Sequence, residues 1–132
     1  MAKKTVLIVD DSPIMRDALR GLFKPLAEFE VSGEAENGQE AIDKAERLRP
    51  DLIILDLSMP VMNGLEAAAP LRKMLPDVRL LLFTQHDGPE VERLALMAGI
   101  HAVVSKSRAA ATLIAQAQAL MAVRSSHQSQ SA

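Results

Sequence analysis

Chemically versatile side chains follow four of the short apolar runs in this sequence. They are acidic, hydroxyl and basic residues at well-separated positions: Asp10 and Asp11, Asp56, Thr84, and Lys106. Any one of them alone is more often a helix cap, a turn residue or a solvated charge than part of a site. Their shared position at the ends of apolar runs favours a common site.

The residue types indicate what such a site could do. Three carboxylates held close together repel one another, so either one binds a proton or a cation neutralises them. Oxygen ligands without Cys or His favour a hard divalent ion, Mg²⁺ or Mn²⁺. An aspartate beside such an ion can attack a phosphoryl group and form an acyl phosphate. Lys106 and Thr84 would then spread the charge on the transferring phosphoryl oxygens.

The apolar runs are short and polar at both ends, which is typical of strands buried on both faces of a parallel sheet. Strand-like and helix-like segments alternate five times, so the sequence predicts an α/β fold, doubly wound, with helices on both faces and right-handed crossovers. In such a sheet the carboxyl ends of all strands share one edge, where ligands bind. The predicted strands are Thr5–Val9, Phe29–Ala35 as an outer strand, Leu52–Leu55, Val78–Phe83 and Ala102–Val104.

Helix signals follow each predicted strand. Ser12-Pro13 fits an N-cap with proline in the first turn, and Asn37 fits a cap with an acid three residues on. Pro70 lies inside the third helix, where a proline costs ~3 kcal/mol or more. We therefore expect an irregular first turn there, and regular helix only from Pro70 to Leu75. Ser107 is expected to cap the last helix.

Length and composition limit the function classes. The chain has 132 residues, enough for one domain, and 48% of them are hydrophobic. Its net charge of −2 gives no reason to expect nucleic-acid binding by this segment. The absence of cysteine excludes disulfides and thiolate metal sites. With no apolar run of ~20 residues and no signal peptide, we expect no membrane span and a cytoplasmic protein. Residues 124–132 are polar, so we expect a domain over 1–123 and then a disordered tail or the start of a linker.

Together, Asp10-Asp11, D56LSMPVMNG64, L82FT84 and V103VSK106 resemble the receiver domain of two-component response regulators, the chemotaxis regulators among them. The resemblance extends over roughly residues 4–123. It implies a flavodoxin-like sheet with strand order 2-1-3-4-5.

The resemblance also implies roles. Asp56 would be the phosphoacceptor; Asp10, Asp11, Asp56 and the backbone carbonyl of Ser58 would hold Mg²⁺, or Mn²⁺; and Thr84 and Lys106 would contact the phosphoryl group. A sensor histidine kinase or a phosphotransfer protein would be the donor. The chain would be a switch with self-catalysed phosphorylation and dephosphorylation, not a metabolic enzyme. It would act on an effector or a second copy through the face of the fourth helix, fifth strand and fifth helix.

Two of the departures from the family pattern concern the expected switch region. Val103 replaces an aromatic that turns inward in many receivers, so switching needs either a smaller rearrangement after Thr84 or a substitute, His86 or His101. Gln85 replaces a small residue and could restrict access to the phosphoryl group.

Three alternatives stay open at this point. A haloacid-dehalogenase-type phosphatase would need an Asp-x-Asp motif and a capping insertion, whereas the acids at Asp10 and Asp11 are adjacent and no insertion is long enough. A pseudo-receiver would bind partners without phosphorylation, and the absence of the usual aromatic at Val103 agrees with this alternative. Finally, Ser105-Lys106-Ser107 and the Ala-rich last helix weakly resemble receivers joined to a helix-turn-helix DNA-binding domain.

Overall fold

All five predicted strands form one parallel sheet. The structure, a computed structural model, describes the backbone of residues 2–131 and the side chains as far as Ala122. The strand order is β2-β1-β3-β4-β5, so β2 and β5 are the edges and β3 is central. The predicted doubly wound fold, its outer strand and its flavodoxin-like order are confirmed. The strands are β1 (Lys4–Val9), β2 (Phe29–Ala35), β3 (Leu52–Leu55), β4 (Arg79–Thr84) and β5 (Ala102–Ser105).

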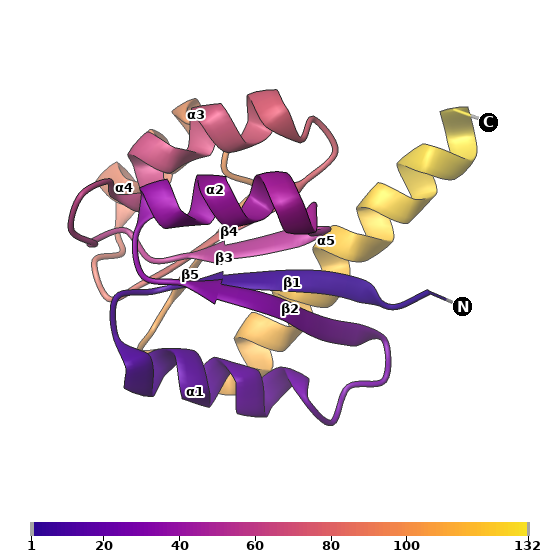
Figure 1. Cartoon of the computed structure of the whole chain (residues 1–132), viewed down its shortest axis with the longest axis horizontal. Helices are drawn as coiled ribbons and strands as arrows, with labels where there is room; N and C mark the ends of the chain where they lie inside the picture. Colours follow the sequence, from indigo (N-terminus) through magenta and orange to yellow (C-terminus); the bar gives the residue numbers. More distant parts are fainter. Residues whose placement is uncertain (1, 132) are drawn as a thin grey trace.

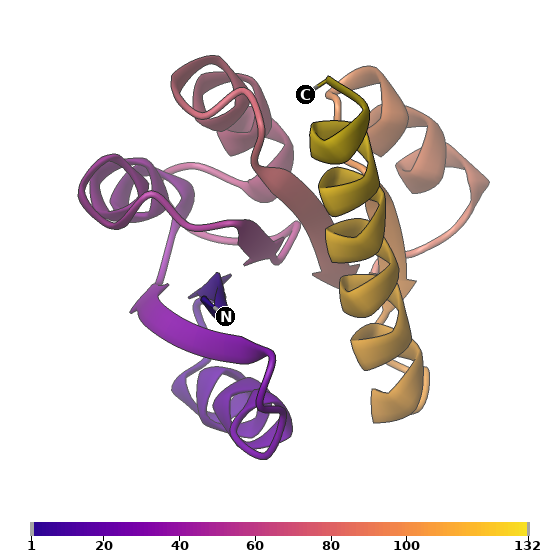
Figure 2. The same cartoon turned by 90° about the vertical axis from the view of Figure 1, so that its right-hand side faces the viewer.

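In the part of the chain that the structure describes, five helices cover both faces of the sheet (Figure 1). One face carries the first and last helices, and the other face carries the middle three, as the end-on view also shows (Figure 2). This division follows from right-handed crossovers in a sheet whose strand order reverses beside β1. The helices are α1 (Pro13–Phe23), α2 (Gly38–Leu48), α3 (Gly64–Met74), α4 (Pro89–Met97) and α5 (Ala110–Ser131).

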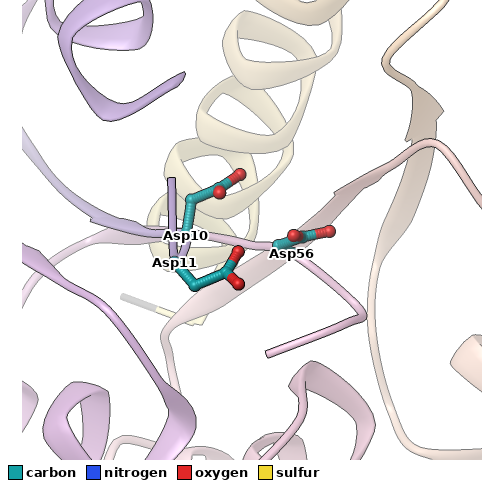
Figure 3. A group of neighbouring side chains, drawn as sticks. All are labelled: Asp10, Asp11 and Asp56. Carbon is teal, nitrogen blue, oxygen red and sulfur yellow. The ribbon is translucent and has the colours of Figure 1, made fainter. Parts of the chain in front are cut away.

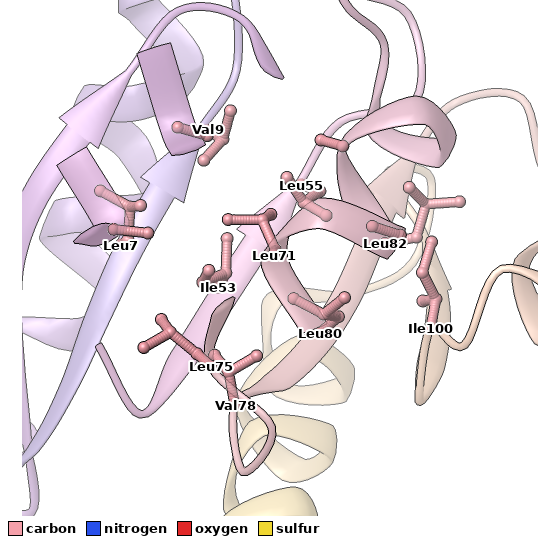
Figure 4. Close-up of a cluster of buried hydrophobic side chains, with 14 of the residues drawn as sticks. Leu7, Val9, Ile53, Leu55, Leu71, Leu75, Val78, Leu80, Leu82 and Ile100 are labelled. Atoms are coloured by element: carbon pink, nitrogen blue, oxygen red, sulfur yellow. The ribbon is translucent and has the colours of Figure 1, made fainter. Parts of the chain in front are cut away.

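The core consists of two apolar layers, one on each side of the sheet. Side chains that alternate along the strands point to opposite faces, so Leu7 and Ile53 pack against α2, α3 and α4 (Figure 4), whereas Ile8 and Ile54 pack against α1 and α5. These four side chains are at most 1% exposed. Each contributes about 1.5–3 kcal/mol by burial, and together the two layers hold the carboxyl ends of β1, β3 and β4 in fixed relation.

Side-chain caps start the first three helices directly after the loops at the carboxyl edge. The Ser12 hydroxyl accepts a hydrogen bond from the Met15 amide at 3.2 Å, and Asn37 accepts one from the Glu40 amide at 2.8 Å. At α3 the cap is reciprocal: Asn63 accepts from the Glu66 amide, and the Glu66 carboxylate accepts from the Asn63 amide. Caps of this kind stabilise a helix by ~1 kcal/mol.

The expectation of an irregular start to α3 is wrong. The helix is regular from Gly64, and Pro70 sits in its interior. Two features explain this. The reciprocal cap of Asn63 and Glu66 fixes the first turn, and Pro70 lies on the exposed face. Water can therefore satisfy the Glu66 carbonyl, which lacks a partner because proline has no amide hydrogen.

We expect Pro70→Ala to raise the free energy of unfolding by about 2 kcal/mol. Alanine restores the hydrogen bond to Glu66 and is ~3 kcal/mol more favourable inside a helix, less the ~1 kcal/mol by which proline restricts the unfolded chain. Urea denaturation followed by circular dichroism measures the change. Pro25→Ala is the control, because Pro25 lies beyond the end of α1 and should give no gain. A Pro70→Ala protein no more stable than wild type would contradict the expectation.

The last helix begins later than expected. Ser107 is not its cap, because the Ser107 amide donates to the Ser105 hydroxyl at 3.2 Å and the helix starts at Ala110. At its other end α5 continues to Ser131, through the segment expected to be a disordered tail or a linker start. Because a helix can itself be a linker, the expected boundary at 123 stays a prediction.

Among the described residues, no helix combines the length and apolar character needed to cross a membrane.

Candidate functional site

The three acids converge at the carboxyl ends of β1 and β3. Asp10 and Asp56 directly follow β1 and β3, which are hydrogen-bonded neighbours, and carboxylate oxygens of Asp10, Asp11 and Asp56 all lie within 4.8 Å of one another (Figure 3). Asp10 is 2% exposed and Asp56 7% exposed, whereas Asp11 is exposed. The sequence prediction that these side chains form one group is confirmed by the geometry.

Lys106 joins the acids from the far end of the chain. Its amine donates to the Asp10 carboxylate at 2.8 Å and lies 3.3 Å from the Asp56 carboxylate. Burial alone would lower the pKa of Lys106, but the hydrogen bond and charge of Asp10, with a smaller contribution from Asp56, outweigh it and raise that pKa. Lys106 is therefore a cation at neutral pH that partly balances the acid group.

Asp56 is electrostatically strained. Burial and then the charge of Asp10 raise its pKa, whereas Lys106 and a hydrogen bond from the Leu57 amide lower it without cancelling the rise. One ammonium does not neutralise three carboxylates. The group therefore has residual negative charge that a divalent cation would satisfy, and its all-oxygen character fits Mg²⁺.

Thr84 ends β4 beside this group. Its backbone carbonyl accepts a hydrogen bond from the Lys106 amide at 2.8 Å, so the two residues lie side by side as predicted. The Thr84 hydroxyl is fully buried and accepts a hydrogen bond from the His86 amide at 3.0 Å. That hydroxyl still has its own proton to donate.

The loop after β3 forms the rim of the site. Ser58 and Asn63 line a shallow hollow together with Asp11, which agrees with a metal-binding role for the Ser58 carbonyl. That role stays a prediction. Val61 in the same loop is 82% exposed and has a φ of 68°. A β-branched residue in this left-handed region costs ~1–3 kcal/mol, so the surrounding contacts must hold the loop in place.

Two glycines supply those contacts. The Gly38 amide at the start of α2 donates to the Met62 carbonyl at 2.8 Å, and a Cβ on Gly38 would lie 2.7 Å from the same oxygen. A Cβ on Gly64 would overlap the carbonyl oxygen of Asp56 itself. Both close approaches require glycine. In the sequence, Gly64 is a turn residue and the last residue of the D56LSMPVMNG64 motif, but neither feature reveals that Asp56 lies against this position.

Arg16 and Glu34 are site neighbours that sequence reasoning missed. The Arg16 guanidinium donates to the backbone carbonyl of Asp10 at 2.6 Å and to the Glu34 carboxylate at 3.1 Å. In the sequence they are charged residues of a helix and of an outer strand, with no signal that relates them to the acids.

The expected switch residues are dispersed. Val103 is half-buried and packs against the α2–α4 side of the core, whereas the Gln85 and His86 side chains are exposed. His101 cannot substitute for the missing aromatic, because it lies before β5, at the opposite end of that strand from Lys106. Its Nδ1 accepts a hydrogen bond from the Leu80 amide at 3.0 Å. Burial and the charges of Arg79 and Arg72 lower its pKa.

Comparison with known proteins agrees with this geometry. The family model of the response regulator receiver domain matches residues 6–118. Among solved structures, a two-component response regulator of the LuxR family from Aurantimonas sp. SI85-9A1 superimposes with a TM-score of 0.84 and 31% identity, over 95% of this chain and 87% of that one.

Curated relatives are named as transcriptional regulators or as response regulators. A putative transcriptional regulator of Pseudomonas aeruginosa is 39% identical over 117 residues, 89% of this chain and 56% of that protein. The nitrate/nitrite response regulator NarL of Escherichia coli is 41% identical over 72% of this chain and 44% of its own length. The chain thus spans about half the length of the curated relatives it matches. Both the matched family model and these relatives show that it belongs to the receiver domains of two-component response regulators.

Proposed function

We propose that Asp56 accepts a phosphoryl group and that the domain switches conformation in response. The observation that carries this proposal is the placement of Asp56: a buried carboxylate at the end of the central strand, grouped with two further acids and 3.3 Å from the Lys106 amine. The raised pKa of Asp56 makes its carboxylate a stronger base than usual. A carboxylate needs no general base to act as a nucleophile, because it has no proton to lose.

The reaction follows from the residues around Asp56. A carboxylate oxygen attacks phosphorus, and the bond from phosphorus to the donor's nitrogen or oxygen breaks with its electron pair leaving on the donor. Lys106 can turn its ammonium from Asp56 to a phosphoryl oxygen, and the Thr84 hydroxyl can donate to another. Asp10, Asp11, Asp56 and the Ser58 carbonyl would hold Mg²⁺, or Mn²⁺, and the bound ion would neutralise part of the negative charge. Water later attacks phosphorus, which releases inorganic phosphate and restores the Asp56 carboxylate.

The donor proposed is a sensor histidine kinase or a phosphotransfer protein carrying a phosphohistidine. Two exposed apolar side chains support a docking surface for it beside the site: Ile14 in the first turn of α1 is 83% exposed, and Val61 is 82% exposed. The chain then serves as a switch with self-catalysed chemistry, not as an enzyme with a separate substrate.

The output proposed is a protein effector or a second copy of the chain bound through the α4–β5–α5 face. Leu96 and Met97 near the end of α4 are 76% and 74% exposed, as expected of a surface that another protein covers. Since this chain covers only about half the length of curated relatives that are named as transcriptional regulators, and a similar solved structure is a DNA-binding response regulator, a DNA-binding output domain is the form that the similarity favours.

The test is incubation with Mg²⁺ and acetyl phosphate followed by intact-mass measurement. We expect one labile phosphoryl adduct on wild type, and none on Asp56→Asn or in EDTA. Since the chain contains no Trp, fluorescence quenching cannot replace mass as the readout.

The alternative is a pseudo-receiver that binds partners without phosphorylation. It predicts no adduct on wild type and no spectral change with beryllofluoride, a phosphoryl mimic. An adduct that survives in Asp56→Asn would instead place the phosphoacceptor elsewhere.

A further inference from the structure

The peptide that joins Asp10 to Asp11 is held by a side chain that approaches from behind the site. Arg16 lies one turn into α1, and its Nη1 donates to the Asp10 carbonyl at 2.6 Å. The orientation of this peptide determines how the two carboxylates that flank it are directed. The other hydrogen bonds of Asp10 fix its amide, to Ala35, and its carboxylate, to Ser12 and Lys106, but not its carbonyl.

Arg16 is itself oriented by β2. Its Nε donates to Glu34 Oε1 at 3.1 Å, and Arg20 Nε donates to Glu34 Oε2 at 3.2 Å. The backbone carbonyl of Glu34 is in turn contacted by the Lys44 amine from α2. The Arg16 side chain is 17% exposed, so this arrangement is more buried than a surface ion pair of the kind that contributes little.

The fork of the guanidinium suits this task. Arginine donates from Nε and Nη1 in fixed directions, so one side chain can bond a carboxylate and a carbonyl at the same time. A lysine amine at the same position is a single point of charge and cannot reproduce both directions. Partners that orient ligating groups typically change metal affinity by ~10–100-fold when they are removed.

We infer that Arg16 is a positioning residue for the cation site: by linking the Asp10–Asp11 peptide to Glu34 on β2, it holds both carboxylates in the geometry that binds the divalent ion. This inference rests on the proposed function for the identity of the ion. It assigns no contact between Arg16 and the ion or the phosphoryl group.

The test is Mg²⁺ affinity, measured by isothermal titration calorimetry on the folded protein, for Arg16→Met and Arg16→Lys. Binding should weaken roughly tenfold in Arg16→Met and by a smaller factor in Arg16→Lys. Arg20→Met is the matched control, because Arg20 also bonds Glu34 but does not touch Asp10; its affinity should stay within twofold of wild type. Urea denaturation in EDTA confirms that each variant is folded.

A purely electrostatic role makes the opposite prediction. Removing a cation near the acids would tighten Mg²⁺ binding in Arg16→Met, and the double variant Arg16→Met/Glu34→Gln, which removes both charges, would return to the wild-type value. Positioning predicts weak binding in both. Tighter or unchanged binding in Arg16→Met overturns the inference. If wild type binds Mg²⁺ but forms no adduct with acetyl phosphate, the proposed function fails while the affinity comparison still decides the role of Arg16.

Discussion

Replacing Gly64 with alanine is expected to slow phosphorylation of Asp56 by at least roughly a hundredfold, because displacement of a reacting group by ~1 Å has an effect of that size. The new Cβ would overlap the Asp56 carbonyl oxygen and lie 3.2 Å from its carbonyl carbon. The backbone of Asp56 cannot move away easily, since Asp56 continues a central strand and its amide donates to the Val9 carbonyl at 2.9 Å. The overpacking should also lower the free energy of unfolding by about 1–3 kcal/mol.

Gly21→Ala is the matched control for this variant. Gly21 lies inside α1, and a Cβ there meets no atom within 4 Å. The same substitution should therefore stabilise the protein by ~1 kcal/mol and leave the rate of adduct formation unchanged. Intact mass measured over time with acetyl phosphate gives the rates, and urea denaturation gives the stabilities. If Gly64→Ala forms the adduct at a rate within tenfold of wild type, the loop between β3 and α3 can move enough to accommodate the new Cβ, and the expectation is wrong.

In EDTA at neutral pH, Asp56→Asn is expected to make the protein more stable by about 0.5–2 kcal/mol. Burial and the Asp10 charge raise the pKa of Asp56, so ionisation of this carboxyl group is less favourable in the fold than in the unfolded chain. Asparagine has the same shape without the charge. Lys106 keeps its 2.8 Å bond to Asp10 and loses only the longer 3.3 Å contact. The functional group thus destabilises the fold that carries it.

The pH dependence tests this cause. Because the folded-state pKa of Asp56 is raised, the folded protein binds more protons than the unfolded chain between the ordinary carboxyl pKa and the folded value. Wild type therefore loses stability as pH rises through that window. The advantage of Asp56→Asn should be smallest near pH ~4 and grow toward neutral pH. A difference that does not change with pH would exclude Asp56 ionisation as its source.

His101 contributes a pH dependence of the opposite sign. Its folded-state pKa is lowered, so stability from this group is full above its ordinary pKa of 6.5 and falls as pH drops below it. Wild type and Asp56→Asn both contain His101, so its effect cancels in the difference between them.

Added Mg²⁺ should stabilise wild type more than Asp56→Asn, since the variant lacks one carboxylate ligand.

The sheet could be predicted from the sequence because its signals are local. Each strand is an apolar run bounded by polar residues, and the alternation with helices determines that the strands are parallel. The carboxyl ends of parallel strands share one edge of the sheet, so the positions of Asp10, Asp56, Thr84 and Lys106 after the apolar runs predict a common site. The regular helix through Pro70 was not predictable in this way, because its tolerance depends on which face of α3 meets water.

What the sequence did not reveal are contacts between backbone and side chain. Gly64 lies against the Asp56 carbonyl, and Arg16 reaches the Asp10 carbonyl; both depend on where one element ends relative to another, to within about an ångström. The periodicity of hydrophobic residues and the residue types do not determine the relative position of two elements to that accuracy. His101 illustrates the same limit: the sequence offered it as a substitute for the missing aromatic, whereas its ring accepts a hydrogen bond from the Leu80 amide.

The hydrogen bond from Lys106 to Asp10 joins residues that are 96 positions apart. During synthesis the three acids leave the ribosome long before the lysine does, and their repulsion stays unbalanced until β5 pairs with β4 at the edge of the sheet. A contact of such long range also closes late in folding, after the entropy of the intervening loop has been lost. The group of side chains that the proposed phosphorylation uses is therefore complete only when the fold is complete, so we expect a partly unfolded chain to take up no phosphoryl group.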